Sequence, residues 1–324
     1  MAEVIRELPV PQPFIPESEL RNRIARLQSS LSSAGLHGAF ITDLPDMLYY
    51  TGTLQQGIFF TPAEGDAVLF VRRSLDRARR ESPVVSIGYA SFKDILAEIQ
   101  LRNASLAKIG IDEGATTLAY FKMLKKAFVA TEFSDCALLL KKIRAVKSTY
   151  ELEKLKKAGE GSRQAMAAMP SLVREGMTEW ELGSKMFTLV SDLGKNCLAR
   201  LTFGSGEFFL GNITFGDNSN YPCAFDGPGG IRGQSPVCPY GGSDRRLKRG
   251  DLIFIDLAFP FEEYYVDKTR VFSLGQPTPH AFQAHARCLE VQESLRKRLL
   301  PGAIPSQIYD EVYAEVVLPN GFDD

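Results

Sequence analysis

Two strand-like runs joined by a short polar stretch constrain this chain more than any other segment. The first run covers residues 252–259, the second covers residues 264–272, and residues 260–263 lie between them. Ile, Phe, Tyr, Val and Thr are frequent in both runs, as is typical of strands, and the intervening stretch is short enough to be a hairpin loop. The sequence therefore predicts a β-hairpin with one aspartate in each strand, Asp256 and Asp267.

The register of this hairpin decides how the two carboxylates lie. If the loop is centred between Phe261 and Glu262, Asp256 pairs directly with Asp267. Directly opposed side chains have Cβ atoms about 4.5–5.5 Å apart, and like charges placed so repel each other. Asp256 also has apolar neighbours along its strand, and an ionised carboxylate taken out of water is costly unless it is paired or bound to metal. The pattern favours a divalent cation site, and two ions about 3.5–4 Å apart would suit such a pair.

A solvated hairpin is the alternative, with Asp256 neutralised by Lys268 or Arg245. Side chains alternate between the two faces of a strand, so Lys268 is expected on the face opposite Asp267. A register that differs by one residue would place the two aspartates on opposite faces and remove the cation site.

The chain is long enough for two domains, because its 324 residues exceed the usual range of a single domain. Residues 1–143 alternate helical and strand-like patterns, which is typical of an α/β domain with a mixed or largely parallel sheet. The strand-like runs are residues 38–42, 57–61, 67–71 and 108–112. A basic segment at residues 139–150 then leads into a long helix, and the second domain is expected to cover residues 144–324.

The second half combines long helices with the hairpin. Thr178 and Glu181 form a T-x-x-E capping box at the start of one helix, and two further helices are expected over residues 279–300 and from residue 305. Residues 204–242 are dense in Gly, Pro, Asn and Asp but match no phosphate-binding motif. We expect this Gly-rich stretch to form turns that shape a substrate or subunit contact.

The composition is that of an ordinary globular protein, with 44% hydrophobic and 24% charged residues and a formal net charge of −1. It indicates neither a nucleic-acid nor a membrane partner, and no apolar signal segment is present, so a cytoplasmic protein is expected. The five cysteines are Cys136, Cys197, Cys223, Cys238 and Cys288. They form no C-x-x-C pair and are expected to be reduced thiols, with a Cys223–Cys238 disulfide as the alternative.

The hairpin resembles the metal-binding signature of the creatinase/aminopeptidase family, the "pita-bread" enzymes, above all Xaa-Pro aminopeptidase and prolidase. The resemblance rests on Gly250-Asp251, on Asp256 and on Asp267-x-Thr269-Arg270 eleven residues later. Residues 140–151 are similar to the linker that opens the catalytic domain of Xaa-Pro peptidases, and residues 46–52 are similar to part of the smaller domain of creatinase and prolidase. The resemblance implies an N-terminal α/β domain followed by an α+β pita-bread catalytic domain.

The same resemblance implies a dinuclear metal site. Asp256 is expected to bind one ion in bidentate fashion, Asp267 to bridge two ions, and Thr269 to support these ligands. In the family a histidine and two glutamates follow, one glutamate acting as the base, and this chain ends before that region. A fragment, or a protein with an incomplete site, is therefore expected. The three histidines, His37, His280 and His285, are not expected to replace the missing ligand.

Many family members carry a substrate-contacting histidine in the Gly-rich stretch, whereas residues 212–221 contain none. Asn212, Asn220 or Tyr221 could take over its hydrogen-bonding role, although none of them is a base near neutral pH.

The resemblance implies a metal-dependent peptidase in which a metal-bridging hydroxide attacks a peptide carbonyl next to proline. Carboxylate-rich ligation favours Mn²⁺, with Co²⁺ or Zn²⁺ as alternatives. The expected partners are a proline-containing peptide and, by family analogy, a second copy of the chain in a homodimer. Two other functions stay open at this point: a non-catalytic peptide-binding relative, and a creatinase-like C–N hydrolase or lyase of the same fold.

Overall fold

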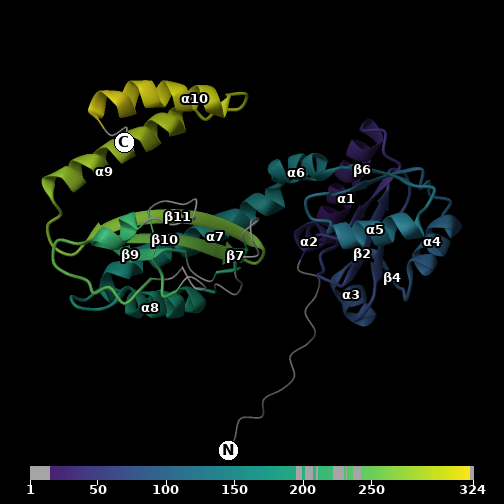
Figure 1. Cartoon of the computed structure of the whole chain (residues 1–324), viewed down its shortest axis with the longest axis horizontal. Helices are drawn as coiled ribbons and strands as arrows, with labels where there is room; N and C mark the ends of the chain where they lie inside the picture. Colours follow the sequence, from purple (N-terminus) through teal and green to yellow (C-terminus); the bar gives the residue numbers. More distant parts are fainter. Residues whose placement is uncertain are drawn as a thin grey trace, which may run out of the picture. The chain divides into compact units, whose positions relative to one another are not determined.

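The computed structural model describes residues 15–194, 211–221, 230, 232–235 and 242–321, together with the backbone of residues 199–200 and 207–208. Contacts divide the chain into two compact units, Met1–Tyr150 and Glu151–Asp324 (Figure 1). In the described part, no helix is long and apolar enough to cross a membrane. Most of the Gly-rich stretch lies outside the described residues, as do Cys197, Cys223 and Cys238, so the expectations about them stay predictions.

The first unit is built on a six-stranded mixed sheet with the strand order β4-β3-β2-β1-β5-β6. The strands are β1 (Gly38–Ile41), β2 (Gly57–Pro62), β3 (Val68–Val71), β4 (Val85–Gly88), β5 (Lys108–Ile111) and β6 (Glu132–Asp135). Strand β2 runs antiparallel to both β1 and β3, while the pairs β1–β5, β3–β4 and β5–β6 are parallel. This topology confirms the predicted α/β domain with a mixed sheet.

Helices cover both faces of this sheet. They are α1 (Glu17–Ser33), α2 (Leu44–Thr51), α3 (Leu75–Glu81), α4 (Phe92–Leu101), α5 (Leu118–Ala127) and α6 (Ala137–Ala145). Ile41 and Phe59 point to the face that packs against α1, α2, α3 and α6, whereas Phe40 and Phe60 point to the face of α4 and α5. The period-two alternation along each strand thus supplies two hydrophobic layers from one sheet.

The second unit contains a three-stranded antiparallel sheet with the order β11-β10-β9. Its strands are β9 (Ile213–Phe215), β10 (Leu252–Phe261) and β11 (Tyr264–Ser273), and a separate two-stranded sheet pairs β7 (Ala199–Arg200) with β8 (Glu207–Phe208). The helices are α7 (Thr149–Ala168), α8 (Glu179–Asp192), α9 (Pro279–Arg298) and α10 (Pro305–Val312). Short helical turns are η1 (Met169–Leu172), η2 (Gly216–Asn220), η3 (Tyr313–Val317) and η4 (Leu318–Asn320).

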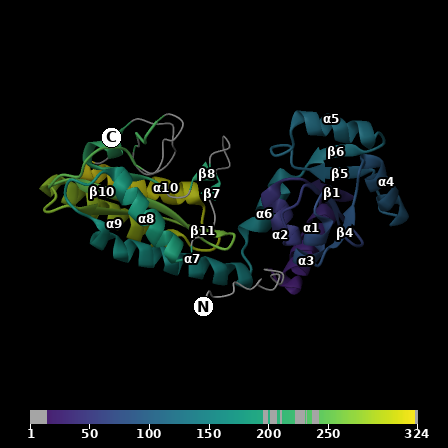
Figure 2. The same ribbon diagram turned by 90° about the horizontal axis from the view of Figure 1, so that it is seen from below.

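One face of this sheet packs against α7 and α8. Ile253, Ile255 and Phe259 of β10 belong to the same buried cluster as Met166 of α7 and Met186 of α8. Figure 1 shows α8 on one side of the sheet and the α9–α10 pair on the other, and in the view from below in Figure 2 these elements overlap. The residues of β10 between these apolar positions, including Asp256, therefore point away from the α7–α8 core.

Two helices begin with a capping box, one of which the sequence predicts. The predicted pair Thr178–Glu181 forms a capping box at the start of α8, and the pair Ser91–Asp94 forms another at the start of α4. In each pair the first side chain accepts a backbone N–H of the first turn and the acidic side chain accepts the N–H of the capping residue, which satisfies donors that a helix start leaves unpaired.

Candidate metal centre

The β10–β11 hairpin has the predicted strands but a different register. Its loop consists of Glu262 and Glu263 alone, so that Asp256 lies opposite Thr269 and Asp267 lies opposite Ala258. The predicted direct pairing of the two aspartates is therefore wrong by two residues, because the centre of the loop lies one residue later than expected.

Two local features explain the longer strand. Pro260 stays within β10, although proline cannot donate to a ladder. Its nitrogen points to the side of β10 on which β9 lies. Strand β9 pairs only with Ile253–Ile255 of β10, so among the described strands Pro260 costs no hydrogen bond between strands. Glu262 takes a positive φ of 52° at the first position of the loop, as two-residue hairpin loops require.

A shift of two residues keeps both aspartates on one face of the sheet. Asp256 and Asp267 become diagonal neighbours, whose Cα atoms lie about 7–8 Å apart in such pairs, within reach of a shared ligand. Burial raises the pKa of the Asp256 carboxyl, and Asp267 raises it further by repulsion, whereas the hydrogen bond from Thr269 lowers it. The two carboxyl groups therefore repel each other, although they are diagonal neighbours and not the directly opposed pair that the sequence predicts.

Asp256 is buried, with 5% of its surface exposed. Its Oδ1 accepts a hydrogen bond from Thr269 Oγ1 at 2.5 Å, on the β11 side. Its backbone N–H donates to the Asn212 carbonyl oxygen at 2.8 Å, on the β9 side. A Cβ added at Gly211 would lie 2.3 Å from the Asp256 carbonyl oxygen and 3.2 Å from Oδ2, so only glycine fits there and Oδ2 lies toward β9.

Neither basic residue considered as a partner of Asp256 pairs with it. Arg245 forms ion pairs with Asp217 and Asp251 instead. Lys268 lies opposite Leu257, on the other face of the hairpin. The alternative prediction, that Lys268 or Arg245 neutralises Asp256, is therefore wrong.

The three residues expected to contact substrate lie in two places. Asn212 is fully buried directly before β9, beside Asp256. Asn220 and Tyr221 follow β9 at the end of η2 and are exposed. Among the described residues, no hydrogen bond joins Asn220 or Tyr221 to Asp256 or Asp267. The structure thus brings Asn212 to Asp256 and leaves Asn220 and Tyr221 at the surface.

The aspartate pair fits part of a divalent cation site. Among the described residues, no group of three or more His, Cys, Asp and Glu side chains could hold a metal ion. Asp256 and Asp267 nevertheless offer carboxylate oxygens on one face, Asp267 being exposed and Asp256 buried. A cation would relieve the repulsion that raises the pKa of Asp256. Carboxylate oxygens suit hard ions such as Mn²⁺.

The histidines lie elsewhere. His37 is in the first unit, where its Nδ1 accepts the Lys108 backbone N–H at 3.1 Å. His280 and His285 lie on α9, after the hairpin.

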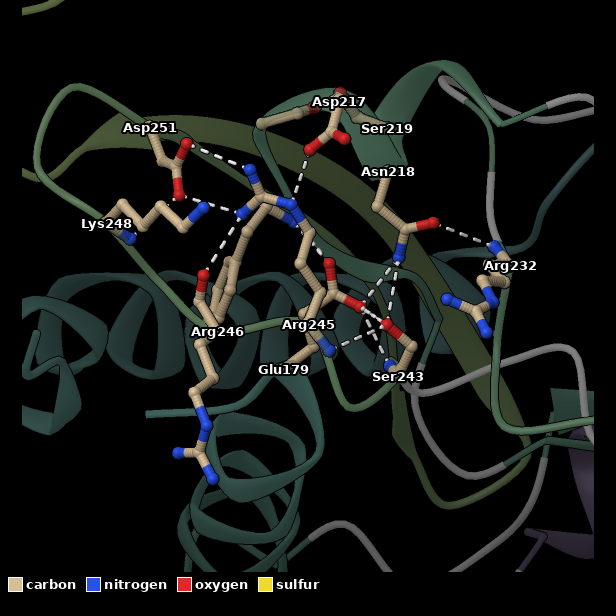
Figure 3. A network of polar contacts seen from close by, with 12 residues as sticks. Glu179, Asp217, Asn218, Ser219, Arg232, Ser243, Arg245, Arg246, Lys248 and Asp251 are labelled. Carbon is tan, nitrogen blue, oxygen red and sulfur yellow. Dashed lines mark hydrogen bonds and ion pairs between the residues drawn. The ribbon is translucent and has the colours of Figure 1, made fainter. Parts of the chain in front are cut away.

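A buried carboxylate that no sequence motif indicates lies at the start of α8. Glu179 is fully buried, and its Oε1 accepts the Phe215 backbone N–H at 2.6 Å. Its Oε2 accepts hydrogen bonds from Asn218 Nδ2 at 2.7 Å and from the Ser243 N–H and Oγ at 2.8 and 2.6 Å (Figure 3). These four bonds satisfy the buried charge and fasten the end of β9 and η2 to α8.

Arg245 continues this network to the start of β10. Its guanidinium donates to both carboxylate oxygens of Asp251, at 2.7 and 3.0 Å, and its Nε donates to Asp217 at 2.5 Å (Figure 3). These contacts lower the pKa of the Asp251 carboxyl, with the hydrogen bonds from Arg245 as the largest cause. Asp251, the aspartate of the Gly250-Asp251 pair, therefore anchors the base of the hairpin and lies apart from the two aspartates on its face.

Comparisons with known proteins agree with this architecture. The family model described as Metallopeptidase family M24 matches residues 153–323, and the model described as Creatinase/Prolidase N-terminal domain matches residues 23–146. An uncharacterized peptidase of Staphylococcus aureus strain USA300 is 24% identical over 309 residues, which cover 93% of this chain and 80% of that protein.

Three solved structures illustrate the likeness of fold. The prolidase from Pyrococcus horikoshii OT3 has a TM-score of 0.75 at 21% identity and covers 93% of this chain and 78% of its own. The X-Pro aminopeptidase from Thermotoga maritima MSB8 has a TM-score of 0.74 at 23% identity, with 92% and 78% covered. The Xaa-Pro dipeptidase from Bacillus anthracis has a TM-score of 0.77 at 18% identity, with 93% and 78% covered. The predicted fold, an α/β N-terminal domain followed by a pita-bread catalytic domain, is confirmed.

Proposed function

Because the chain belongs to metallopeptidase family M24, we propose that it is a metal-dependent peptidase that hydrolyses a peptide bond next to proline. The observation that carries this proposal is the pair of interacting carboxyl groups, Asp256 and Asp267, on one face of the β10–β11 hairpin. The names of the similar structures, prolidase and X-Pro aminopeptidase among them, support the choice of a proline-containing peptide as substrate.

In this proposal Asp256 and Asp267 hold the divalent cations, two Mn²⁺ ions in the favoured form, with Co²⁺ or Zn²⁺ as alternatives. Bound ions of this kind supply Lewis acidity toward a peptide carbonyl and toward a water molecule. Thr269 restrains the Asp256 carboxylate by donating to Oδ1, which leaves Oδ2 for other contacts. Asp267, which is exposed, presents its carboxylate to solvent and substrate.

Asn220 and Tyr221 are the proposed substrate contacts. Both are exposed at the end of η2, and each offers a hydrogen-bonding side chain. The Glu179 network holds Asn218 in the same turn, which limits the movement of η2. Asn212, the third residue expected to bind substrate, is fully buried and not at the surface, and its carbonyl oxygen accepts the Asp256 N–H.

The Asp267→Asn variant tests the proposal. With Mn²⁺ and Xaa-Pro dipeptides or longer proline-containing peptides as substrates, we expect this variant to lose hydrolysis by a factor of at least about 100, while its circular dichroism spectrum stays unchanged. The matched control is Asp310→Asn, which removes an exposed carboxylate from α10 and is expected to keep full activity.

The same assay separates the other candidates. Full activity of Asp267→Asn would refute the metallopeptidase assignment. Binding of Mn²⁺ and of peptide by the unchanged chain, without any turnover, would favour a non-catalytic peptide-binding relative. A homodimer is proposed from the family analogy alone, and sedimentation equilibrium of the purified chain would test it.

A further inference from the structure

The side chain of Asn212 is buried and has no hydrogen-bond partner in the described part of the chain. None of its surface is exposed, and within the described residues neither Oδ1 nor Nδ2 has a hydrogen-bond partner. Most buried polar groups in proteins are paired, so an amide in this state indicates an ion or a water molecule beside it.

Asn212 lies next to Asp256 in the sheet. The pairing of β9 with β10 ends at Ile255↔Ile213. The next residues along the two segments, Asp256 and Asn212, are joined by a hydrogen bond from the Asp256 N–H to the Asn212 carbonyl oxygen. Directly opposed residues of antiparallel strands share a face, with Cβ atoms about 4.5–5.5 Å apart. The Asn212 amide and the Asp256 carboxylate therefore emerge side by side from the same face of the sheet.

The Asp256 carboxylate is oriented so that one oxygen is left on the Asn212 side. Oδ1 is held by Thr269 on the β11 side, and Oδ2 lies 3.2 Å from the position that a Cβ of Gly211 would take, next to Asn212. This side of the site therefore holds Asp256 Oδ2 and the Asn212 amide oxygen, with the Asp267 carboxylate on the same face. A side-chain amide oxygen beside carboxylate oxygens is a donor set typical of hard divalent cations.

We propose that the side-chain oxygen of Asn212 is a further donor to a divalent cation held by Asp256 and Asp267. The proposal rests on the assignment of the cation to these two aspartates in the proposed function. In this proposal Asn212 contacts the cation and not the substrate, because the fully buried Asn212 side chain leaves no surface for a peptide to contact.

Mn²⁺ binding to the full chain tests the proposal without an activity assay. The electron paramagnetic resonance signal of free Mn²⁺ gives the dissociation constant at pH 7. We expect Asn212→Leu, which replaces the amide by an apolar group of similar size, to raise this constant by about tenfold or more. Its unfolding midpoint in the absence of metal is expected to stay the same or to rise, since an unpaired buried amide is removed.

A second variant and a matched control sharpen the test. Asn212→Asp adds a third carboxylate, so we expect it to bind Mn²⁺ at least as tightly as the unchanged chain and to unfold at a lower temperature without metal. Thr214→Val removes a buried hydroxyl that also has no partner within the described residues. Thr214 lies two residues after Asn212, opposite Phe254. We expect this control to keep its Mn²⁺ affinity within about twofold, since the proposal gives the Thr214 hydroxyl no contact with the cation although Thr214 is a diagonal neighbour of Asp256.

The variant Asp256→Asn separates the role proposed for Asn212 from the cation site proposed for Asp256 and Asp267. If it abolishes Mn²⁺ binding while Asn212→Leu stays within about twofold of the unchanged chain, the role of Asn212 is refuted and the cation site of the aspartates stands. If Asp256→Asn keeps full affinity, or if the unchanged chain binds no Mn²⁺, both assignments are refuted. Equal losses of affinity in Asn212→Leu and Thr214→Val would indicate a structural effect and would also overturn the proposal.

Discussion

At the scale of single residues, Glu179 shows which part of the site the sequence could not predict. Its four hydrogen-bond donors belong to Phe215, Asn218 and Ser243, which lie 36, 39 and 64 residues further along the chain. No local pattern encodes such distant partners. Glu181, two residues later, was predicted in its capping role because its partner Thr178 is only three residues away.

The variant Glu179→Gln measures what this buried carboxylate contributes. In the variant an NH₂ group replaces one carboxylate oxygen and faces the donors of Ser243 or Phe215. At least one buried N–H then loses its acceptor, and the remaining hydrogen bonds no longer have a charged acceptor. We expect the free energy of unfolding to fall by about 2 kcal/mol or more, as measured by urea denaturation. The matched control is Glu181→Gln in the same helical turn, where glutamine also serves in a capping box, so a change below about 0.5 kcal/mol is expected. Equal losses in both variants would contradict the role assigned to Glu179.

At the scale of elements, the sequence predicted the central strands and missed the edges. The strand-like runs correspond to β1, β2, β3 and β5, which are rich in buried apolar residues. The missed strands, β4 and β6, are the two edges of the six-stranded sheet and have mixed or partly exposed positions. An edge strand has a neighbour on one side only and carries more polar residues, so its hydrophobic pattern is weak.

The hairpin register illustrates a second limit at this scale. The sequence predicts both strands and both aspartates, but it predicts the loop one residue too early because proline favours a loop over a strand at position 260. Proline usually ends a strand, and it is tolerated here because its nitrogen faces the side of β10 that no described strand pairs with at this point. The predicted site is still possible in the observed register, because a shift of two residues keeps each side chain on the same face of the sheet.

The base of the hairpin leads to a prediction about pH. Arg245 lowers the pKa of Asp251 in the folded protein, so this pair stabilises the fold above the unfolded pKa of about 3.9 and loses its contribution as the pH falls through the lower, folded value. We expect Asp251→Asn to be less stable than the unchanged chain at pH 7, and the difference to shrink as the pH falls below about 4. Urea denaturation between pH 3 and pH 7 measures it. A difference that stays constant over this range would show that the charge of Asp251 is not its source.

At the scale of the whole molecule, each unit has its own hydrophobic core. The clusters of the first unit draw only on residues up to Ile143, and the cluster of the second unit only on residues from Ala165 onward. The division into two units therefore corresponds to separate cores, and a ligand bound in one unit stabilises that unit directly.

This separation yields a prediction for metal binding. The only tryptophan of the chain, Trp180, lies on α8 in the second unit, so its fluorescence follows the unfolding of the unit that carries Asp256 and Asp267. Mn²⁺ at about 100 times its dissociation constant is expected to stabilise this unit by about 2.7 kcal/mol and to raise the midpoint of the Trp180 transition. Far-UV circular dichroism reports both units, and we expect the part of its transition that belongs to the first unit to keep its midpoint. The Asp256→Asn chain serves as the control and should show no shift with Mn²⁺. A shift that persists in this variant, or one confined to the first unit, would place the bound cation away from the hairpin.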